Sequence, residues 1–186
     1  STFDSRSVHE RIYDEIRIGL SQGVFSEGQT LTTRGLAATF GTSEMPVREA
    51  IRRLVAEKYI VQSSNRSFQV PQLNSESFRD VISVRLVLEG FAAARAAGKA
   101  KPADIEVLRA IEAQNAQDTL RLNEEFHFSV YALTESGTLL ETIETLWSRS
   151  GPYLASVMGF DSSMDVFHQA AQMHDRIIAA IEAQDD

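Results

Sequence analysis

The chain has 186 residues, of which 43% are apolar, enough for a hydrophobic core in one large or two small domains. It contains no cysteine, which excludes disulfides and thiolate metal sites. It has no apolar run of about 18 residues, so we expect no membrane span. The N-terminus shows no signal-peptide pattern, and we expect a cytoplasmic protein.

The charge is divided unevenly along the chain. The net charge of −8 argues at first against a nucleic-acid binder. Residues 1–73, however, hold 9 basic and 8 acidic residues, a net charge of +1, whereas residues 74–186 hold 9 basic and 18 acidic residues, a net charge of −9. We therefore predict two domains with different partners, residues 1–73 and residues 74–186.

The first 54 residues contain three helical patterns. Apolar spacing predicts helices over residues 4–21 and 33–39, and Ser43 can cap a third helix with Pro46 in its first turn. Gly41 provides the turn before the third helix. Two short helices joined by a tight glycine-containing turn are typical of a helix-turn-helix, whose second helix enters the major groove of DNA. The buried stripe that we predict on this helix consists of Val47, Ala50, Ile51 and Leu54.

After Lys58 the period of the sequence changes to about two. Residues 59–62 and 67–70 are predicted to form two strands around a polar tip at residues 63–66. This pattern indicates a β-hairpin wing, and Arg66 at its tip could reach phosphates or the minor groove.

From residue 76 onward the sequence is helical throughout. We predict a mainly α fold, with an N-terminal winged helix-turn-helix that carries a small β-hairpin wing and a C-terminal all-α antiparallel helical bundle. The predicted helices of the bundle are 76–98, 102–116, 118–134, one containing Leu139 to Trp147 that is interrupted near Gly151-Pro152, and 162–183.

Several stretches carry a family resemblance. Gln29-Thr30-Leu31, Arg34-Gly35-Leu36-Ala37 and the segment 41–54, with Pro46-Val47-Arg48-Glu49-Ala50 at its centre, resemble the winged helix-turn-helix of the GntR family of bacterial transcription regulators. Residues 76–186 are similar to the all-helical effector domain, of the FCD type, of the FadR subgroup. The matching text there is Arg85-Leu86-Val87-Leu88-Glu89, Asn123-Glu124-Glu125-Phe126-His127 and His174-Asp175-Arg176-Ile177-Ile178.

The resemblance implies a homodimer that binds a near-palindromic operator in double-stranded DNA. Arg34 and Arg48 match family positions that contact DNA, and Ser43 at a helix start can bind a phosphate. Glu44 departs from the family, which commonly has Arg there, although a carboxylate can accept from cytosine N4. We therefore expect an unusual operator or weaker DNA affinity. The predicted DNA-binding residues are Arg34, Ser43, Glu44, Met45, Arg48, Arg52 and Arg66.

For Arg52 and Arg53 an alternative stays open. Either side chain can belong to a solvated helix face or pair with Glu49 or Glu57.

The helical domain contains a candidate metal site. Asn123 and His127 lie four residues apart, on one helix face, and His174 lies on a stripe that points inward. Two histidines and an amide can bind a divalent metal such as zinc, nickel or manganese. Members of the subgroup often use an Asp or Asn and three histidines, and the metal holds a carboxylate effector. The alternative is that both histidines are satisfied core residues.

The family's last histidine lies beyond the position at which this sequence ends. We expect either that the sequence is truncated after Asp186 or that the site lacks this ligand.

Arg85 and Arg149 are candidate partners for the carboxylate of a small organic acid effector. The alternative for Arg85 is an intrahelical pair with Glu89. The leading functional hypothesis is a transcription regulator whose operator affinity responds to this effector. The alternatives are a DNA-binding dimer whose helical domain only dimerises, and a metal-dependent enzyme that uses Asn123, His127 and His174.

Overall fold

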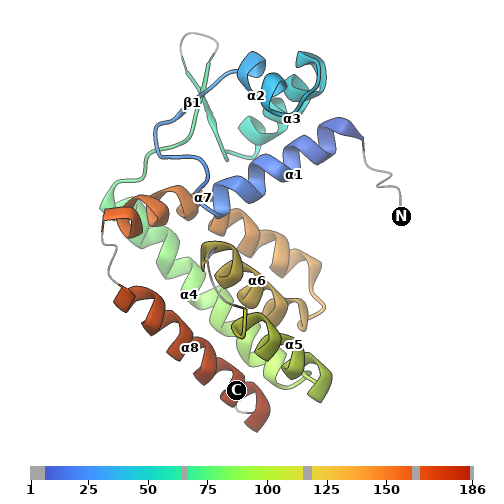
Figure 1. The fold of residues 1–186 in the computed structure, drawn as a ribbon, viewed down its shortest axis with the longest axis vertical. Helices are drawn as coiled ribbons and strands as arrows, with labels where there is room; N and C mark the ends of the chain where they lie inside the picture. Colours follow the sequence, from blue (N-terminus) through green and yellow to red (C-terminus); the bar gives the residue numbers. More distant parts are fainter. Residues whose placement is uncertain (1–6, 64–66, 115–118, 161–163, 185–186) are drawn as a thin grey trace. The chain divides into compact units, whose positions relative to one another are not determined.

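The computed structural model describes residues 7–63, 67–114, 119–160 and 164–184 (Figure 1). The fold is mainly α, as predicted. Its helices are α1 (Val8–Ser21), α2 (Thr33–Thr39), α3 (Glu44–Ala56), α4 (Ser75–Ala97), α5 (Pro102–Glu112), α6 (Thr119–Ala132), α7 (Gly137–Phe160) and α8 (Met164–Ala183). Its strands are β1 (Thr30–Leu31), β2 (Val61–Gln62) and β3 (Phe68–Gln69). Within the described residues, no helix is both long enough and apolar enough to cross a bilayer.

The chain forms two compact units. The first comprises the described parts of residues 1–78 and 147–157, and the second comprises those of residues 79–146 and 158–186. The predicted domain boundary after residue 73 therefore lies inside the first unit, which also contains the middle of α7.

In the first unit, α2 and α3 lie beside a small antiparallel sheet (Figure 1). The two predicted wing strands are β2 and β3, and Val61 pairs with Gln69. The sheet has the order β1-β3-β2, with Leu31 opposite Phe68. The sequence pattern predicts no strand at Leu31, so β1 is an addition to the predicted fold.

Local sequence explains where these helices start. Ser7 and Glu10 form a capping box at the start of α1, and the Thr32 hydroxyl accepts from the Gly35 N–H at the start of α2. Gly41 between α2 and α3 has φ +60°, a left-handed conformation that favours glycine. The predicted stripe of α3 is buried in the core of this unit, at 0–1% exposure: Val47, Ala50, Ile51 and Leu54.

The second unit is helical, with α5 packed against α6 and α8. Its helices agree with the predicted ones to within a few residues at their ends. The predicted interruption near Gly151-Pro152 is wrong, because α7 continues through both residues. Within the first unit, a Cβ atom on Gly151 would lie 2.2 Å from the Leu20 carbonyl oxygen. The glycine is thus explained by close packing against the end of α1 rather than by a helix break.

Candidate functional site

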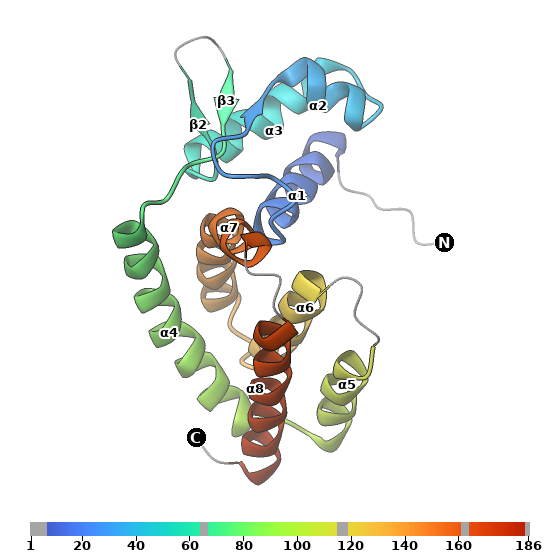
Figure 2. The ribbon, with the colours of Figure 1, turned by 60° about the vertical axis from the view of Figure 1, so that its left-hand side comes forward.

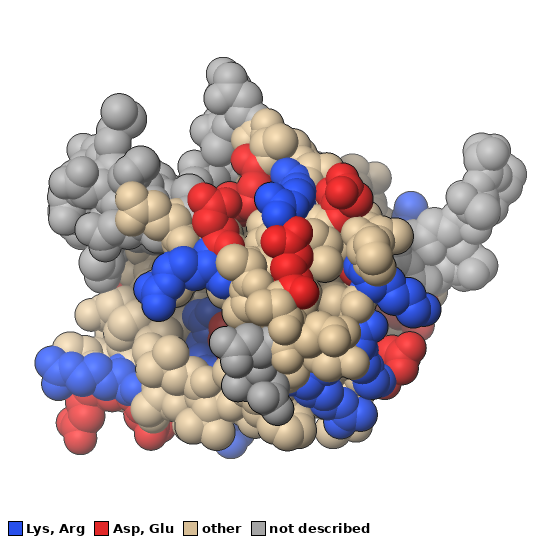
Figure 3. Space-filling model, turned by 90° about the horizontal axis from the view of Figure 1, so that it is seen from below, with Lys and Arg blue, Asp and Glu red and all other residues tan. Residues whose placement is uncertain are grey.

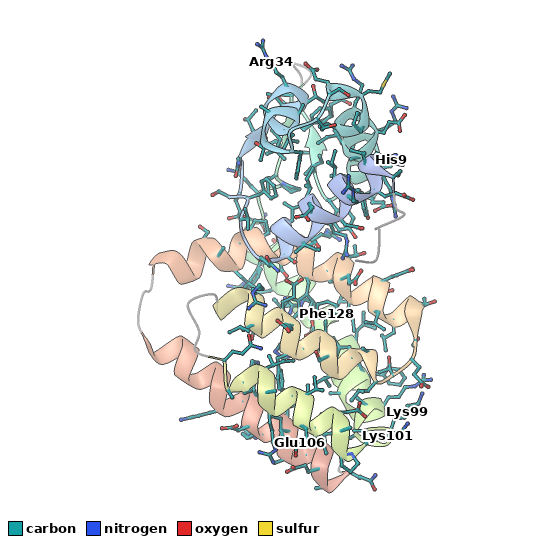
Figure 4. All side chains as sticks on the ribbon, turned by 45° about the vertical axis from the view of Figure 1, so that its right-hand side comes forward. His9, Arg34, Lys99, Lys101, Glu106 and Phe128 are labelled. Atoms are coloured by element: carbon teal, nitrogen blue, oxygen red, sulfur yellow. The ribbon has the colours of Figure 1, made fainter. Side chains whose placement is uncertain are left out.

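The exposed face of α3 carries most of the residues predicted to contact DNA. Glu44, Met45 and Arg48 are exposed, with Met45 at 68%, and so is Arg52 one turn later. At 100° per residue these four positions span about 100° of the helix surface, and the centre of this face lies about 120° round the helix from the centre of the buried stripe. Ser43 is the N-cap of α3, and its side chain makes no capping hydrogen bond. Arg34 is exposed on α2 and projects away from the helices (Figure 4).

Glu44 joins α2 to this face of α3. The Thr33 hydroxyl donates to Glu44 Oε2 at 3.2 Å, and Arg48 Nη2 lies 3.7 Å from the same oxygen. Both charged side chains remain about half exposed, so the pair is weak. The contacts hold the Glu44 carboxylate beside Arg48, where an acceptor and a donor of hydrogen bonds are presented together.

Arg53 is exposed, but its side chain pairs with neighbouring residues of the first unit. Its Nε donates to Glu57 Oε1 at 2.8 Å, and its guanidinium lies 3.9 Å from the centre of the Tyr13 ring. The Tyr13 hydroxyl donates to the other oxygen of Glu57. Burial, followed by the Glu57 hydrogen bond, raises the pKa of Tyr13, which stays a donor. The alternative of pairing with Glu57 is thus confirmed for Arg53, and the cluster ties α1 to α3.

Arg52 is exposed, and Arg66 lies outside the described residues. On the face of the molecule drawn in Figure 3, which is seen from below the view of Figure 1, basic and acidic side chains are interspersed.

In the second unit, His127 of α6 and His174 of α8 come together. Their Nε2 atoms are 3.3 Å apart, and the two rings meet edge to face. Phe126, which is fully buried, stacks on His174 with ring centroids 4.0 Å apart. The predicted inward position of His174 is confirmed, because its exposed fraction is 5%.

Each histidine binds a further side chain through its Nδ1 atom. His174 Nδ1 lies 2.6 Å from Glu112 Oε1, and His127 Nδ1 lies 3.1 Å from the Tyr131 hydroxyl oxygen. Tyr131 in turn donates to Glu89 Oε2 at 2.7 Å. Neither Glu112 nor Tyr131 is among the site residues predicted from the sequence. Tyr131 follows His127 by four residues, a spacing that could have indicated it, whereas Glu112 belongs to another helix and has no such local signal.

These partners determine which histidine nitrogens carry protons. A carboxylate only accepts hydrogen bonds, so His174 Nδ1 donates to Glu112. The Tyr131 proton is committed to Glu89, so the Tyr131 oxygen accepts from His127 Nδ1. A neutral imidazole carries one N–H, which leaves the Nε2 atom of each neutral ring with a lone pair. The two lone pairs converge.

Electrostatics favour the neutral ring of His127. Burial, followed by the charges of His174 and Arg85, lowers the pKa of His127 to about 3. Burial and the Glu89 carboxylate raise the pKa of Tyr131, so that its hydroxyl keeps the proton it donates. The 3.3 Å contact between the two Nε2 atoms is compatible with a hydrogen bond, in which a proton on His174 Nε2 is donated to His127, or with a cation bound by both nitrogens.

The spacing of the two Nε2 atoms suits a divalent metal. With metal–nitrogen bonds of about 2.0–2.1 Å, a separation of 3.3 Å corresponds to an angle of roughly 107° at the metal, near the tetrahedral value. Asn123 lies one turn before His127 and is half-buried. Within the described part of the chain, however, no three His, Asp or Glu side chains are grouped so that they could hold a metal ion. The histidine pair could therefore supply two ligands, and Asn123 stays the third ligand predicted from the sequence.

The two arginines predicted to bind an effector have different surroundings. Arg85 of α4 is buried, and its Nε donates to Glu89 Oε1 at 2.6 Å, which is the intrahelical pair considered as the alternative. Arg85 is thereby linked to His127 through a series of hydrogen bonds, from Arg85 to Glu89, from Tyr131 to Glu89, and between Tyr131 and His127. Arg149 is exposed on the part of α7 that belongs to the first unit.

Comparisons with known proteins match both parts of the chain. Residues 8–70 match the model of the bacterial regulatory proteins of the gntR family, and residues 80–186 match that of the FCD domain. The chain is 28% identical over 183 residues to the HTH-type transcriptional regulator McbR of Escherichia coli (strain K12), covering 94% of this chain and 82% of McbR.

Another relative is the probable D-xylose utilization operon transcriptional repressor of Paenarthrobacter nicotinovorans, 28% identical over 186 residues, covering 96% of this chain and 80% of that protein. The solved structure of E. coli McbR/YncC matches with a TM-score of 0.84 and 26% identity, covering 97% of this chain and 88% of that one. A regulator from Rhodococcus sp. RHA1 shares the fold, with a TM-score of 0.71 at 19% identity, covering 96% of this chain and 90% of that one.

These relatives are named as transcriptional regulators and not as enzymes, so the reading of the chain as a metal-dependent enzyme is set aside. The chain belongs to the GntR family of bacterial transcription regulators, in the FadR subgroup that carries an FCD domain.

Proposed function

We propose that this regulator binds a near-palindromic operator as a homodimer, and that a small organic acid held at the His127–His174 pair changes its affinity for that operator. The observation that carries the proposal is the convergence of two Nε2 atoms, 3.3 Å apart, inside the helical unit.

The exposed face of α3 supports the DNA-binding part of the proposal. Arg48 and Arg34 supply donors for guanine or phosphate, and the N-terminus of α3 with Ser43 suits a phosphate. Glu44 accepts from a cytosine amino group, and Met45 offers an apolar contact to a thymine methyl group. Arg52 adds a phosphate contact, and Arg66 of the wing tip is proposed on sequence grounds alone.

The helical unit supports the effector part. A divalent metal such as zinc, nickel or manganese supplies a positive charge that a carboxylate can coordinate. His127 and His174 bind it through Nε2, and the Asn123 amide oxygen is the third ligand from this chain. Arg85 is a further positive group at the end of the same series of contacts.

A thermal-shift screen of the full chain tests this proposal. Wild type, His127→Ala, His174→Ala and the control His9→Ala are melted with and without zinc, then with a panel of organic acids. A metal at 100 times its Kd stabilises the fold by about 2.7 kcal/mol. We expect this stabilisation in wild type and His9→Ala only, with a further increase from one class of acid when zinc is present.

Each variant is compared with its own metal-free melting temperature, so a loss of stability caused by the substitution itself does not affect the result. If neither the metal nor any acid shifts the melting temperature of wild type, the effector part of the proposal is wrong and the helical domain only dimerises.

A further inference from the structure

Part of α7 packs against the end of α1 with almost no space between the two backbones. Within the first unit, a Cβ atom on Gly151 would lie 2.2 Å from the Leu20 carbonyl oxygen and 2.5 Å from the Ser21 carbonyl oxygen. A Cβ atom on Gly23 would lie 2.2 Å from the Cβ atom of Ala155. These distances are far below van der Waals contact, so neither glycine can be replaced without moving the backbone. The two segments lie side by side in both ribbon views (Figure 1, Figure 2).

A hydrogen bond extends this contact by one turn of α7. The buried Ser148 hydroxyl donates to the Arg17 carbonyl oxygen at 3.3 Å. Ser148, Gly151 and Ala155 follow one another at intervals of three and four residues, so they lie on one face of the helix. We use the name α1–α7 joint for Gly23, Ser148, Gly151 and Ala155. The partners of Ser148 and Gly151 are main-chain oxygens of α1, which have no rotamers through which the contact could relax.

From the joint, α7 continues into the second unit without a break. Its residues 147–157 belong to the first unit, whereas residues 137–146 belong to the second and include the fully buried Ile143. Only residues 133–136 separate α7 from α6, the helix that carries His127. Rigid secondary structure carries energetic coupling between sites, whereas a flexible linker lets its two ends move independently. One helix and a short loop thus connect the DNA-binding unit to the helix of the histidine pair.

The helix α4 also passes from one unit to the other, but it is held less closely in the first unit. Its Phe78 stacks on Tyr153 of α7, with ring centroids 4.2 Å apart. The Leu73 N–H, ahead of α4, donates to Glu27 Oε1 at 2.8 Å. Both contacts use side chains, which can turn about their rotatable bonds, whereas Gly151 meets the main chain of α1 directly. The observations therefore favour α7 over α4 as the element that α1 must follow.

We propose that α7 transmits a change in the helical unit to the DNA-binding unit, and that the α1–α7 joint makes α1 follow α7. A ligand bound by His127 and His174 shifts α6, and the short loop passes this shift to the start of α7. Through the joint, α1 moves with α7. The Arg53–Glu57–Tyr13 cluster ties α1 to α3, so the orientation of α3 changes with the occupancy of the histidine pair.

The inference rests on the proposed function for the ligand, so its first test uses no metal, acid or DNA. Hydrogen exchange at residues 16–24 of the full chain is measured by mass spectrometry in Ile143→Ala and in Leu108→Ala. Both substitutions truncate a buried side chain of the second unit, one in α7 and the matched control in α5. We expect exchange at residues 16–24 to rise at least about tenfold in Ile143→Ala and less than about twofold in Leu108→Ala.

Equal changes in the two variants, or no change in Ile143→Ala, would overturn the inference. Circular dichroism checks that both proteins fold, and Ile143→Val with Leu108→Val makes the same comparison if an alanine variant does not.

A second test adds zinc and examines the joint itself. Gly151→Ala is compared with Gly137→Ala, since a Cβ atom on Gly137 of α7 would meet nothing within 4 Å. We expect zinc to raise the melting temperature of wild type and both variants, and to change exchange at residues 16–24 in wild type and Gly137→Ala only.

The two tests separate the inference from the proposed function. If zinc binds wild type but leaves exchange at residues 16–24 unchanged, or if Gly151→Ala responds like Gly137→Ala, the inference is wrong and the metal site stands. If zinc does not bind wild type, the metal site of the proposed function is wrong, and the comparison of Ile143→Ala with Leu108→Ala alone decides whether α7 couples the two units.

Discussion

At the scale of single residues, the neighbours of His127 and His174 decide which nitrogens are available to a ligand. The pattern of Asn123, His127 and His174 could be found in the sequence because helical spacing and family resemblance both indicate it. Glu112 could not, since it lies 62 residues from His174 and only tertiary packing brings it within hydrogen-bonding distance. Such partners fix the tautomer of a metal-binding histidine and orient its ring.

The first prediction concerns Glu112. A glutamine at this position can donate as well as accept, so Glu112→Gln no longer forces the proton of His174 onto Nδ1. We expect zinc affinity to fall about 10- to 100-fold, as measured by competition with a chromophoric chelator. Glu106→Gln, at an exposed position on the same helix, is the matched control and keeps wild-type affinity. Equal affinity in both variants would show that Glu112 does not position the ring.

The second prediction concerns acid stability. The pKa of His127 is about 3 in the fold and near 6.5 in the unfolded chain, so the unfolded state binds more protons between these values. The stability contributed by the neutral ring is therefore present above pH 6.5 and is lost as the pH falls toward 3. As the pH is lowered, the free energy of unfolding of metal-free wild type, measured with urea, should fall more steeply than that of His127→Gln. The difference between the two slopes should reach up to about 1.4 kcal/mol per pH unit. Parallel pH profiles for the two proteins would contradict this account.

At the scale of elements, the two faces of α3 have separate roles. The buried stripe and the Arg53–Glu57–Tyr13 cluster fix the helix to its unit, which leaves Glu44, Met45 and Arg48 exposed. Sequence periodicity could predict the buried face. It could not decide whether Arg53 faces solvent or Glu57, because both are compatible with the same helical spacing.

A third prediction follows for α3. Glu44→Arg removes the partner of Arg48 and adds a cation to the proposed DNA face, so operator affinity should rise, with altered sequence preference. The salt dependence should steepen by about one unit in the slope of log K against log salt. Glu15→Arg makes the same change of charge at an exposed position of α1 and should leave sequence preference unchanged. If Glu44→Arg leaves both affinity and preference unchanged, position 44 lies outside the interface.

Two elements differ from the sequence-based prediction for physical reasons. β1 is only two residues long, so no alternation of apolar residues could indicate it, and it exists because β3 offers it a pairing edge. The sequence predicts a break at Gly151-Pro152 because both residues weaken an isolated helix. In the fold, the glycine is needed for the approach of α7 to the Leu20 carbonyl oxygen, and the helix continues.

At the scale of the whole molecule, the proposed regulator links a ligand site in the helical unit to a DNA-binding face in the first unit. Such a link requires that the effector bind better to one arrangement of the two DNA-binding heads than to another. The family could be predicted from the sequence, because its motifs are present, whereas the division into residues 1–73 and 74–186 stays a prediction from the uneven charge. The effector could not, because the shape of a pocket is set by side chains from several helices.

Fluorescence anisotropy with a duplex of the DNA upstream of the chain's own gene tests the central claim most directly. The full chain is titrated without ligand, with zinc, and with zinc plus the organic acid that stabilises it in the thermal screen. We predict salt-sensitive binding whose Kd changes about 5- to 150-fold when both ligands are present, and no such change in His174→Ala. Specific binding with the same Kd under all three conditions would contradict the account.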